Sequence, residues 1–292
     1  MKKHFTIIFF VFSLFSFGQN NRILFALEEN SPIQKRVVND HQLQTVTIFY
    51  QVDFTTRENF DIKKFINSVN SKIPKVGNSG YAVLDWEGEK EMALNQQKDP
   101  NEFLKAKNDF INAIKMAKKL RPNMKWSFYG FPTTNFWSPD VKWENRNNRL
   151  HDLFVQMDFF APSLYLFYPP MQLSSVMTKN YLRKNLAFSF RLSKKYKKEV
   201  IPFIWHRYHP SNDKYGLKQV YENDFRHYVE TLFHYSSDGI NVQRVIWWNA
   251  ENFYYNNRNH YRNISQEYSN VTFEAQQTTI FNKYLKIIKE SL

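Results

Sequence analysis

The chain has no cysteine among its 292 residues. This absence excludes disulfide bonds, thiol catalysis, cysteine-ligated metal sites and a lipid-modified cysteine anchor. The fold must therefore rest on its apolar core alone. Hydrophobic residues make up 42% of the chain and aromatic residues 18%, which is enough for a sizeable core.

Glycine is scarce, with only 7 residues, and no Gly/Ser-rich or Pro-rich stretch divides the chain. A length of 292 residues allows one large domain or two small ones. Because no linker separates two parts, we expect a single domain over residues 20–292. No glycine-rich phosphate loop follows the first predicted strand, which argues against dinucleotide binding.

Long hydrophobic runs are also missing. The longest, residues 5–15, is shorter than the roughly 20 apolar residues that a membrane-spanning helix needs. It follows Lys2 and Lys3 and precedes the small and polar residues at 16–19, which is the order of a secretory signal. We therefore predict a signal peptide at residues 1–19, export to the periplasm or the extracellular space, and no membrane span in the mature protein.

Acidic residues are outnumbered, with 27 Asp and Glu against 40 Lys and Arg, so the net charge is +13. An exported basic protein attracts polyanions, among them acidic polysaccharides and nucleic acids. A solvated lysine-rich surface with no polyanion partner explains the charge equally well, so the charge by itself names no substrate.

Seven short runs rich in β-forming residues recur along the chain and are nearly continuous in apolar residues. This pattern is typical of strands buried on both faces. They cover residues 22–27, 45–52, 80–87, 125–132, 157–166, 199–208 and 242–250.

Amphipathic helical patterns separate these runs. Apolar residues over 62–73 fall on one helix face, and Asp99 followed by Pro100 predicts the start of another helix. Two more patterns cover residues 225–233 and 280–288. Alternating strands and helices predict an α/β fold, which we expect to be a single TIM-like (β/α) barrel of about seven to eight parallel strands.

Acidic and aromatic residues gather where the predicted strands end. In such a barrel the carboxyl ends of the strands form the mouth, where the chemistry takes place. Aromatic faces stack on sugar rings and carboxylates cleave glycosidic bonds, so these residues predict a carbohydrate site. They are Asp85, Glu87, Tyr129, Tyr165, Trp205, Arg207, Tyr208, Trp248 and Asn249.

Asp85 and Glu87 are two residues apart, so on a strand both side chains face the same way while Trp86 faces the other. Two neighbouring carboxylates raise each other's pKa, and we expect a protonated Glu87 beside an ionised Asp85. Such neighbours cannot flank a sugar at the separation of about 5 to 10 Å that conventional glycosidases use. They suit a substrate-assisted reaction, in which the acetamido group of an N-acetylhexosaminide attacks its own anomeric carbon. A solvated strand end or a structural ion pair remains the alternative for an isolated pair.

The segment GYAVLDWEGE at residues 80–89 resembles the catalytic strand of the hyaluronidases, family 56 of the glycoside hydrolases. Four further segments resemble motifs of that family in the same order along the chain. They are AKKLRPNMKWSFYGFP at 117–132, APSLYL at 161–166, EVIPFIWHRY at 199–208 and RVIWWNA at 244–250.

The resemblance implies roles for matching residues. Glu87 falls on the proton donor of the family, Asp85 and Tyr165 on residues that hold the substrate acetamido group, and Trp248 on the wall of the acetamido pocket. It implies an endo-β-N-acetylhexosaminidase that cleaves hyaluronan or chondroitin-like glycosaminoglycans and needs no cofactor. Packing in the core is the alternative for Tyr165 and Trp248.

The chain also departs from the family pattern. Residues 133–137 replace a tyrosine-rich stretch, so that a tyrosine contact to the sugar is either missing or supplied by Tyr129. Asn249 replaces a glycine. Trp205, Arg207 and Tyr208 are expected to line the groove, where Arg207 and other cations would hold a polyanion with an affinity that falls as salt rises. These departures leave a second hypothesis open, a barrel that binds anionic polysaccharide without cutting it.

Eight histidines show no metal-ligand spacing, so no metal site is predicted. G-x-S-x-G is absent. Nucleic-acid binding has only the net charge to support it, and we do not expect it.

Overall fold

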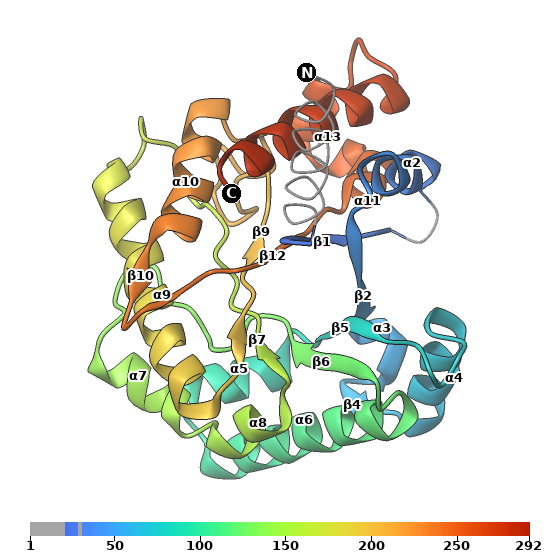
Figure 1. Ribbon diagram of the computed structural model, residues 1–292, viewed down its shortest axis with the longest axis vertical. Helices are drawn as coiled ribbons and strands as arrows, with labels where there is room; N and C mark the ends of the chain where they lie inside the picture. The colour runs from blue at the N-terminus through green and yellow to red at the C-terminus, as the bar shows by residue number, and fades with distance from the viewer. Residues whose placement is uncertain (1–20, 29–30) are drawn as a thin grey trace, which may run out of the picture.

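Six parallel strands form one curved sheet at the centre of the protein (Figure 1). The computed structural model describes residues 21–28 and 31–292, so the predicted signal peptide lies outside the described residues. The order across the sheet is β6-β5-β2-β1-β12-β9, and each neighbouring pair is parallel. The strands are β1 (Ile23–Ala26), β2 (Gln44–Tyr50), β5 (Gly80–Asp85), β6 (Met124–Phe128), β9 (Phe203–Ile204) and β12 (Val245–Trp247).

Short extended segments continue the curve from β6 round to β9. The Asp158 N–H donates to the carbonyl of Trp126 at 2.8 Å, and β7 (Phe159–Phe160) then pairs in parallel with β8 (Glu199–Val200). Ser163 forms a parallel bridge to Phe203 in β9. Each of the seven predicted runs thus contains a strand, and the predicted TIM-like α/β architecture is confirmed.

Helices cover the outside of the strands (Figure 1). Two small hairpins, β3 (Thr55–Thr56) with β4 (Asn59–Phe60) and β10 (Ser236–Ser237) with β11 (Ile240–Asn241), lie outside the barrel sheet. The α-helices are α2 (Pro32–His41), α3 (Gln51–Phe54), α4 (Ile62–Lys72), α5 (Glu89–Gln96), α6 (Pro100–Leu120), α7 (Val141–Asn148), α8 (His151–Gln156), α9 (Ser175–Tyr196), α10 (Glu222–His234), α11 (Glu251–Asn256), α12 (Arg262–Glu267) and α13 (Phe273–Glu290).

The predicted start of the helix at Asp99 and Pro100 and the predicted apolar face over residues 62–73 are both confirmed. The carboxylate of Asp99 accepts hydrogen bonds from the N–H groups of Asn101 at 2.7 Å and Glu102 at 3.1 Å, and Pro100 follows as the first residue of α6. Helix α4 buries Phe65 and Val69, two members of the apolar face predicted over residues 62–73.

The strands divide the core into two layers. In β1, Ile23 and Phe25 pack outwards against the helices, while Leu24 and Ala26 belong to the inner cluster of the barrel. Burial on both faces explains the nearly continuous apolar strands. Within the part of the chain that the structure describes, no helix has both the length and the apolarity needed to cross a bilayer.

Candidate active site

The inner face of β5 ends in two acids at the mouth of the barrel. Val83 belongs to the inner cluster, and Asp85 follows two residues later on the same face. Trp86 points outwards, is 2% exposed and stacks on Phe110 with ring centroids 4.6 Å apart. The tryptophan therefore fixes the strand end in the outer core, and this leaves Asp85 and Glu87 together at the mouth.

Asp85 and Glu87 line a cavity of about 140 Å³, which we call the acid pocket. Its walls are mostly aromatic, and Tyr165 and Trp248 lie almost parallel with ring centroids 5.8 Å apart. The structure brings six of the predicted site residues together here: Asp85, Glu87, Tyr129, Tyr165, Trp205 and Trp248.

The environment of the pocket disfavours ionisation of both acids. Burial raises the pKa of Asp85 well above its ordinary value, and the charges of Glu87 and Glu91 raise it further. Desolvation also raises the pKa of Glu87. Asp85 Oδ1 has no hydrogen-bond partner among the described residues, so no protein donor there offsets the cost of its charge.

The expected proton order, with Asp85 ionised and Glu87 protonated, stays a prediction, because burial raises the pKa of both acids. For Asp85 the charges of two other carboxylates, Glu87 and Glu91, add to the effect of burial. Acids coupled this closely titrate as a unit, so a proton held by Asp85 is shared within the pair.

Two tyrosines on the pocket wall keep their protons. Burial raises the pKa of Tyr129, and the charges of Asp85 and Glu87 raise it further. Burial likewise raises the pKa of Tyr165, with Tyr129 and Asp85 adding to the effect. The Tyr129 hydroxyl donates to Ser163 Oγ at 3.0 Å. Both side chains are therefore neutral hydroxyls beside the acids.

Arg207 does not lie in the pocket, which corrects its predicted placement in the groove. Its guanidinium is fully buried and donates to Glu251 Oε1 at 2.6 Å, Glu251 Oε2 at 2.7 Å and Glu267 Oε2 at 2.8 Å. Beyond β9 the chain turns into a bridge between Arg207 and Gln219, which directs the arginine into the interior. Two carboxylates already neutralise it there, so it has no contact to offer a polyanion.

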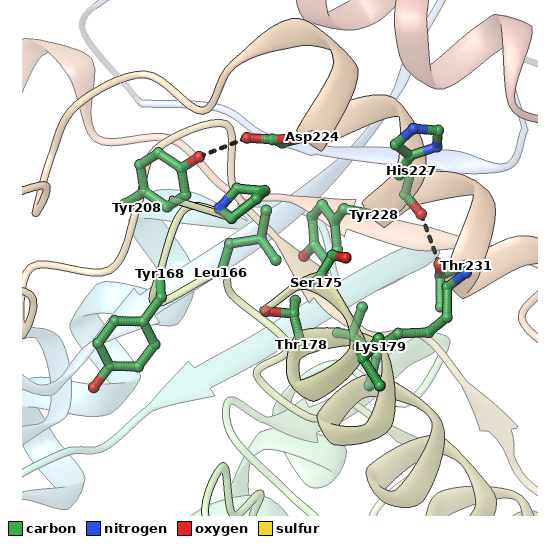
Figure 2. Close-up of a pocket in the computed structure, with 13 residues that line it drawn as sticks. Leu166, Tyr168, Ser175, Thr178, Lys179, Tyr208, Asp224, His227, Tyr228 and Thr231 are labelled. Carbon is green, nitrogen blue, oxygen red and sulfur yellow. Dashed lines mark hydrogen bonds between the residues drawn. The ribbon is translucent and has the colours of Figure 1, made fainter. Parts of the chain in front are cut away.

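Tyr208 and Asn249 are also placed away from the acid pocket. The Tyr208 hydroxyl donates to Asp224 Oδ2 at 3.2 Å in a separate pocket of about 280 Å³ between α9 and α10 (Figure 2). Asp85 and Glu87 do not line this second pocket. Asn249 is fully buried, donates to the carbonyl of Ala26 at 2.7 Å and accepts from Gln34 Nε2 at 2.6 Å. Both predicted groove residues therefore make internal contacts instead.

A wider groove of about 1000 Å³ runs from the acid pocket across the flank of the barrel, and we call it the flank groove. Its lining includes Tyr50 from the end of β2, Phe253 from α11 and Lys72. It shares five residues with the acid pocket: Ile48, Asp85, Glu87, Trp248 and Tyr254. The two therefore form one continuous cleft with the acids at the junction.

The cleft is not the basic groove that the sequence led us to expect. Among the described residues that line the acid pocket and the flank groove, Lys72 is the only lysine or arginine. Its ammonium donates to Asp53 Oδ2 at 2.8 Å, whereas Glu28 adds a further acid to the lining. The excess of basic residues thus lies elsewhere on the protein.

The titratable residues in or beside the acid pocket that were not predicted are Tyr254, His209 and Glu91. Tyr254 and His209 line the acid pocket from positions beyond the strand ends, where strand alternation gives no guide. Glu91 has a signal in its closeness along the chain, because it lies four residues after Glu87, in the first turn of α5.

Comparison with known proteins finds relatives among the hyaluronidases, although no family model matches the chain. Hyaluronidase A of Vespa velutina is 27% identical over 157 residues, 50% of this chain and 43% of the relative. The salivary hyaluronidase of Lutzomyia longipalpis is 27% identical over 120 residues, 37% of this chain and 31% of the relative. The chain thus matches less than half the length of these curated relatives.

Solved structures give a broader match. The crystal structure of bee venom hyaluronidase aligns with a TM-score of 0.62 at 14% identity, covering 92% of this chain and 99% of the other. The same protein in complex with a hyaluronic acid tetramer aligns with a TM-score of 0.58 at 14% identity, covering 89% and 99%. At this identity the likeness shows a shared fold.

Proposed function

Because the chain is similar in sequence to hyaluronidases and shares the fold of the bee venom protein, we propose that it is a glycoside hydrolase of the hyaluronidase type. Its substrate would be a polymer containing N-acetylhexosamine, of the hyaluronan or chondroitin kind, cut within the chain. The bee venom protein in complex with a hyaluronic acid tetramer supports this substrate class.

One observation carries the proposal: two acids with raised pKa values share one face at the carboxyl end of a barrel strand, inside an aromatic pocket. A carboxyl group that keeps its proton near neutral pH is what a general acid needs. The alternative of a solvated strand end does not fit Asp85, which is partly buried, and the more exposed Glu87 lines the same pocket.

The reaction begins with attack of the acetamido carbonyl oxygen of the bound sugar on its own anomeric carbon. The glycosidic bond breaks, and the leaving oxygen takes the proton of Glu87. The resulting Glu87 carboxylate then takes a proton from water, whose oxygen attacks the anomeric carbon and reopens the cyclic intermediate. Two inversions give net retention, and the covalent intermediate forms within the sugar.

Asp85 would orient and stabilise the acetamido group. Its carboxylate accepts the acetamido N–H, and it balances the positive charge that develops as the ring closes. A bound N–H favours ionised Asp85, so the proton that the pair shares shifts towards Glu87, where the leaving oxygen needs it. The substrate itself would thus set the proton order.

The aromatic wall would hold the same sugar. Tyr165 offers a neutral hydroxyl to the acetamido group, and Trp248 packs beside Tyr165 to enclose the methyl group. Tyr129 and Trp205 complete the wall. Such a pocket favours substrates that carry an acetamido group over sugars that carry a hydroxyl there.

We further propose that the protein is exported, because Lys2 and Lys3 precede the apolar run at residues 5–15. Similarity to a salivary hyaluronidase supports this proposal. Sequencing the amino terminus of the mature protein tests it, with a start after residue 18 or 19 expected.

The decisive experiment replaces the proposed proton donor. Glu87→Gln should reduce the release of reducing ends from hyaluronan and chondroitin by several orders of magnitude, because the amide has no proton to donate to the leaving oxygen. Glu89→Gln is the matched control, since this exposed residue is absent from the lining of the acid pocket. It should retain activity.

Wild-type protein that binds these polymers without releasing reducing ends would instead support a binding barrel. Mass analysis of the products distinguishes the reaction classes. Saturated products indicate hydrolysis, while an unsaturated uronate would indicate a lyase and contradict the mechanism.

A further inference from the structure

A row of aromatic rings connects two sides of the barrel mouth and passes through the acid pocket. Successive ring centroids along it are 4.6 to 6.3 Å apart. We call it the aromatic row. In order it contains Trp137, Phe136, Phe167, His209, Tyr165, Trp248, Trp205, Tyr254 and Phe253.

The two ends of the row come from distant parts of the barrel. Trp137 follows β6, whereas Phe253 lies in α11, which follows β12. Three strands, β5, β2 and β1, separate β6 from β12 in the sheet. The ends therefore lie on different sides of the acid pair.

The ends are exposed while the middle is covered. Trp137 is 63% exposed and Phe253 54%, against 4% for Tyr165 and 1% for Trp205. Large aromatic side chains left in water are typical of binding surfaces. Phe253 also lines the flank groove, which places it on the same continuous cleft as the acids.

Trp137 is held in place by a built loop. Its N–H donates to Asn135 Oδ1 at 3.0 Å, and the N–H of Asn135 donates to Oδ1 of Asn185, which is 1% exposed, at 3.0 Å. Tyr168 packs beside the indole with ring centroids 5.7 Å apart. The backbone that carries the indole is thus held in place before any ligand arrives, which lowers the entropic cost of stacking on it.

We propose that Trp137 and Phe253 are stacking sites for sugar rings on the two sides of the scissile bond, beyond the sugar held in the acid pocket. This inference rests on the proposed function. Stacking on the apolar faces of sugar rings needs no cationic partner, which suits a cleft whose described lining contains Lys72 as its only lysine or arginine. The polymer is then held on both sides of the scissile bond, so glycosidic bonds near the ends of the polymer are poor substrates.

Binding measurements in a Glu87→Gln background test this inference, because the polymer stays uncut. Calorimetric titration uses two probes, a hyaluronan tetrasaccharide and a hyaluronan decasaccharide. Trp137→Ala and Phe253→Ala should each weaken decasaccharide binding roughly tenfold, the loss expected for one stacking contact, and leave tetrasaccharide binding unchanged. Trp137→Phe should restore most of the affinity.

Tyr221→Ala is the matched control, since Tyr221 is 48% exposed and lies outside both the aromatic row and the lining of the cleft. It should bind both probes normally. Unchanged decasaccharide affinity in both alanine variants overturns the proposal, as does equal weakening for both probes, which would place the two residues at the cleavage position. Failure of the proposed function would show in a separate measurement: the natural protein, with Glu87 in place, would release no reducing ends from the polymer.

Discussion

The guanidinium of Arg207 and the carboxylate of Glu251 form a double hydrogen bond in the interior, with Nε 2.6 Å from Oε1 and Nη2 2.7 Å from Oε2. Arg207 is fully buried and Glu251 is 1% exposed. Burial alone would raise the pKa of Glu251, and Arg207 reverses the shift and lowers this pKa well below its ordinary value. Since Glu251 begins α11, the pair ties the segment after β9 to the helix that carries Tyr254.

Arg207→Ala should lower the free energy of unfolding by about 3 to 5 kcal/mol, because Glu251 would be left as a buried charge without its partner. Arg226→Ala is the control. Its ion pair with Glu290 has side chains 37% and 41% exposed, so the loss should stay below about 1 kcal/mol. Urea unfolding of both variants makes the comparison, and equal losses would contradict a structural role for the Arg207 pair.

Asp85→Asn should abolish turnover and stabilise the protein at neutral pH. The folded-state pKa of Asp85 is raised, so the folded protein binds more protons than the unfolded chain, and stability falls as pH rises from about 4 through the raised pKa. Asparagine does not titrate. The melting temperature of the variant should therefore exceed that of the natural protein by an amount that grows with pH over this window.

Asp152→Asn provides a control of opposite sign. The hydrogen bond and charge of Lys107 lower the pKa of Asp152, so its ionised form stabilises the folded state above its unfolded pKa. This variant should melt below the natural protein at neutral pH. A melting temperature of Asp85→Asn that is lower at pH 7 would show that Asp85 is stabilised by a contact absent from this structure.

Glu91→Gln should move the pH profile of turnover to lower pH. The charge of Glu91 is one of the causes that raise the pKa of Asp85, and glutamine removes it while keeping the acceptor that Asn95 Nδ2 contacts at 2.8 Å. We expect the alkaline limb of kcat/KM to shift by on the order of half a pH unit. Glu89→Gln should leave the profile unchanged. An identical profile for Glu91→Gln would show that the charge of Glu91 does not affect the titration of Asp85 and Glu87.

Much of the barrel could be predicted because strand burial and helix capping are local signals. Asp99 and Pro100 mark the start of α6 within two residues. The inward direction of Asp85 follows from its position two residues after Val83. Helix α9 is not among the predicted helices, since Leu186, Phe188, Phe190 and Leu192 alternate as they would in a strand, and all four are buried.

The errors at the site share a different cause. Arg207, Tyr208 and Asn249 were predicted to face the cleft because they stand at the ends of the predicted strand runs. In the structure β9 already ends at Ile204 and β12 at Trp247, and strand alternation stops there. Arg207 turns towards Glu251, 44 residues later, and Asn249 towards Gln34, 215 residues earlier. Such partners meet only through tertiary packing, and no local pattern in the sequence announces them.

Gly88 connects the proposed proton donor to α5, and its backbone conformation favours glycine. Its φ is +87°, and a Cβ there would lie 3.2 Å from Glu58 Oε2. Gly88→Ala should therefore lower the free energy of unfolding by about 1 to 2 kcal/mol and also displace Glu87, which it follows directly. We expect kcat to fall by at least tenfold with a smaller change in KM, because proton donation requires placement to within a fraction of an ångström.

Gly239→Ala separates strain from catalysis. Gly239 also has a positive φ, +74°, and lies in the turn between β10 and β11, with nothing within 4 Å of an added Cβ. The loss in free energy of unfolding that comes from the backbone should be similar to that of Gly88→Ala. No residue of the cleft is adjacent to Gly239, so this variant should lose stability while keeping kcat. If both variants lost kcat in proportion to their loss of stability, the effect of Gly88→Ala would be a general loss of folded protein. A loss of kcat confined to Gly88→Ala would tie turnover to the position of the Glu87 carboxylate.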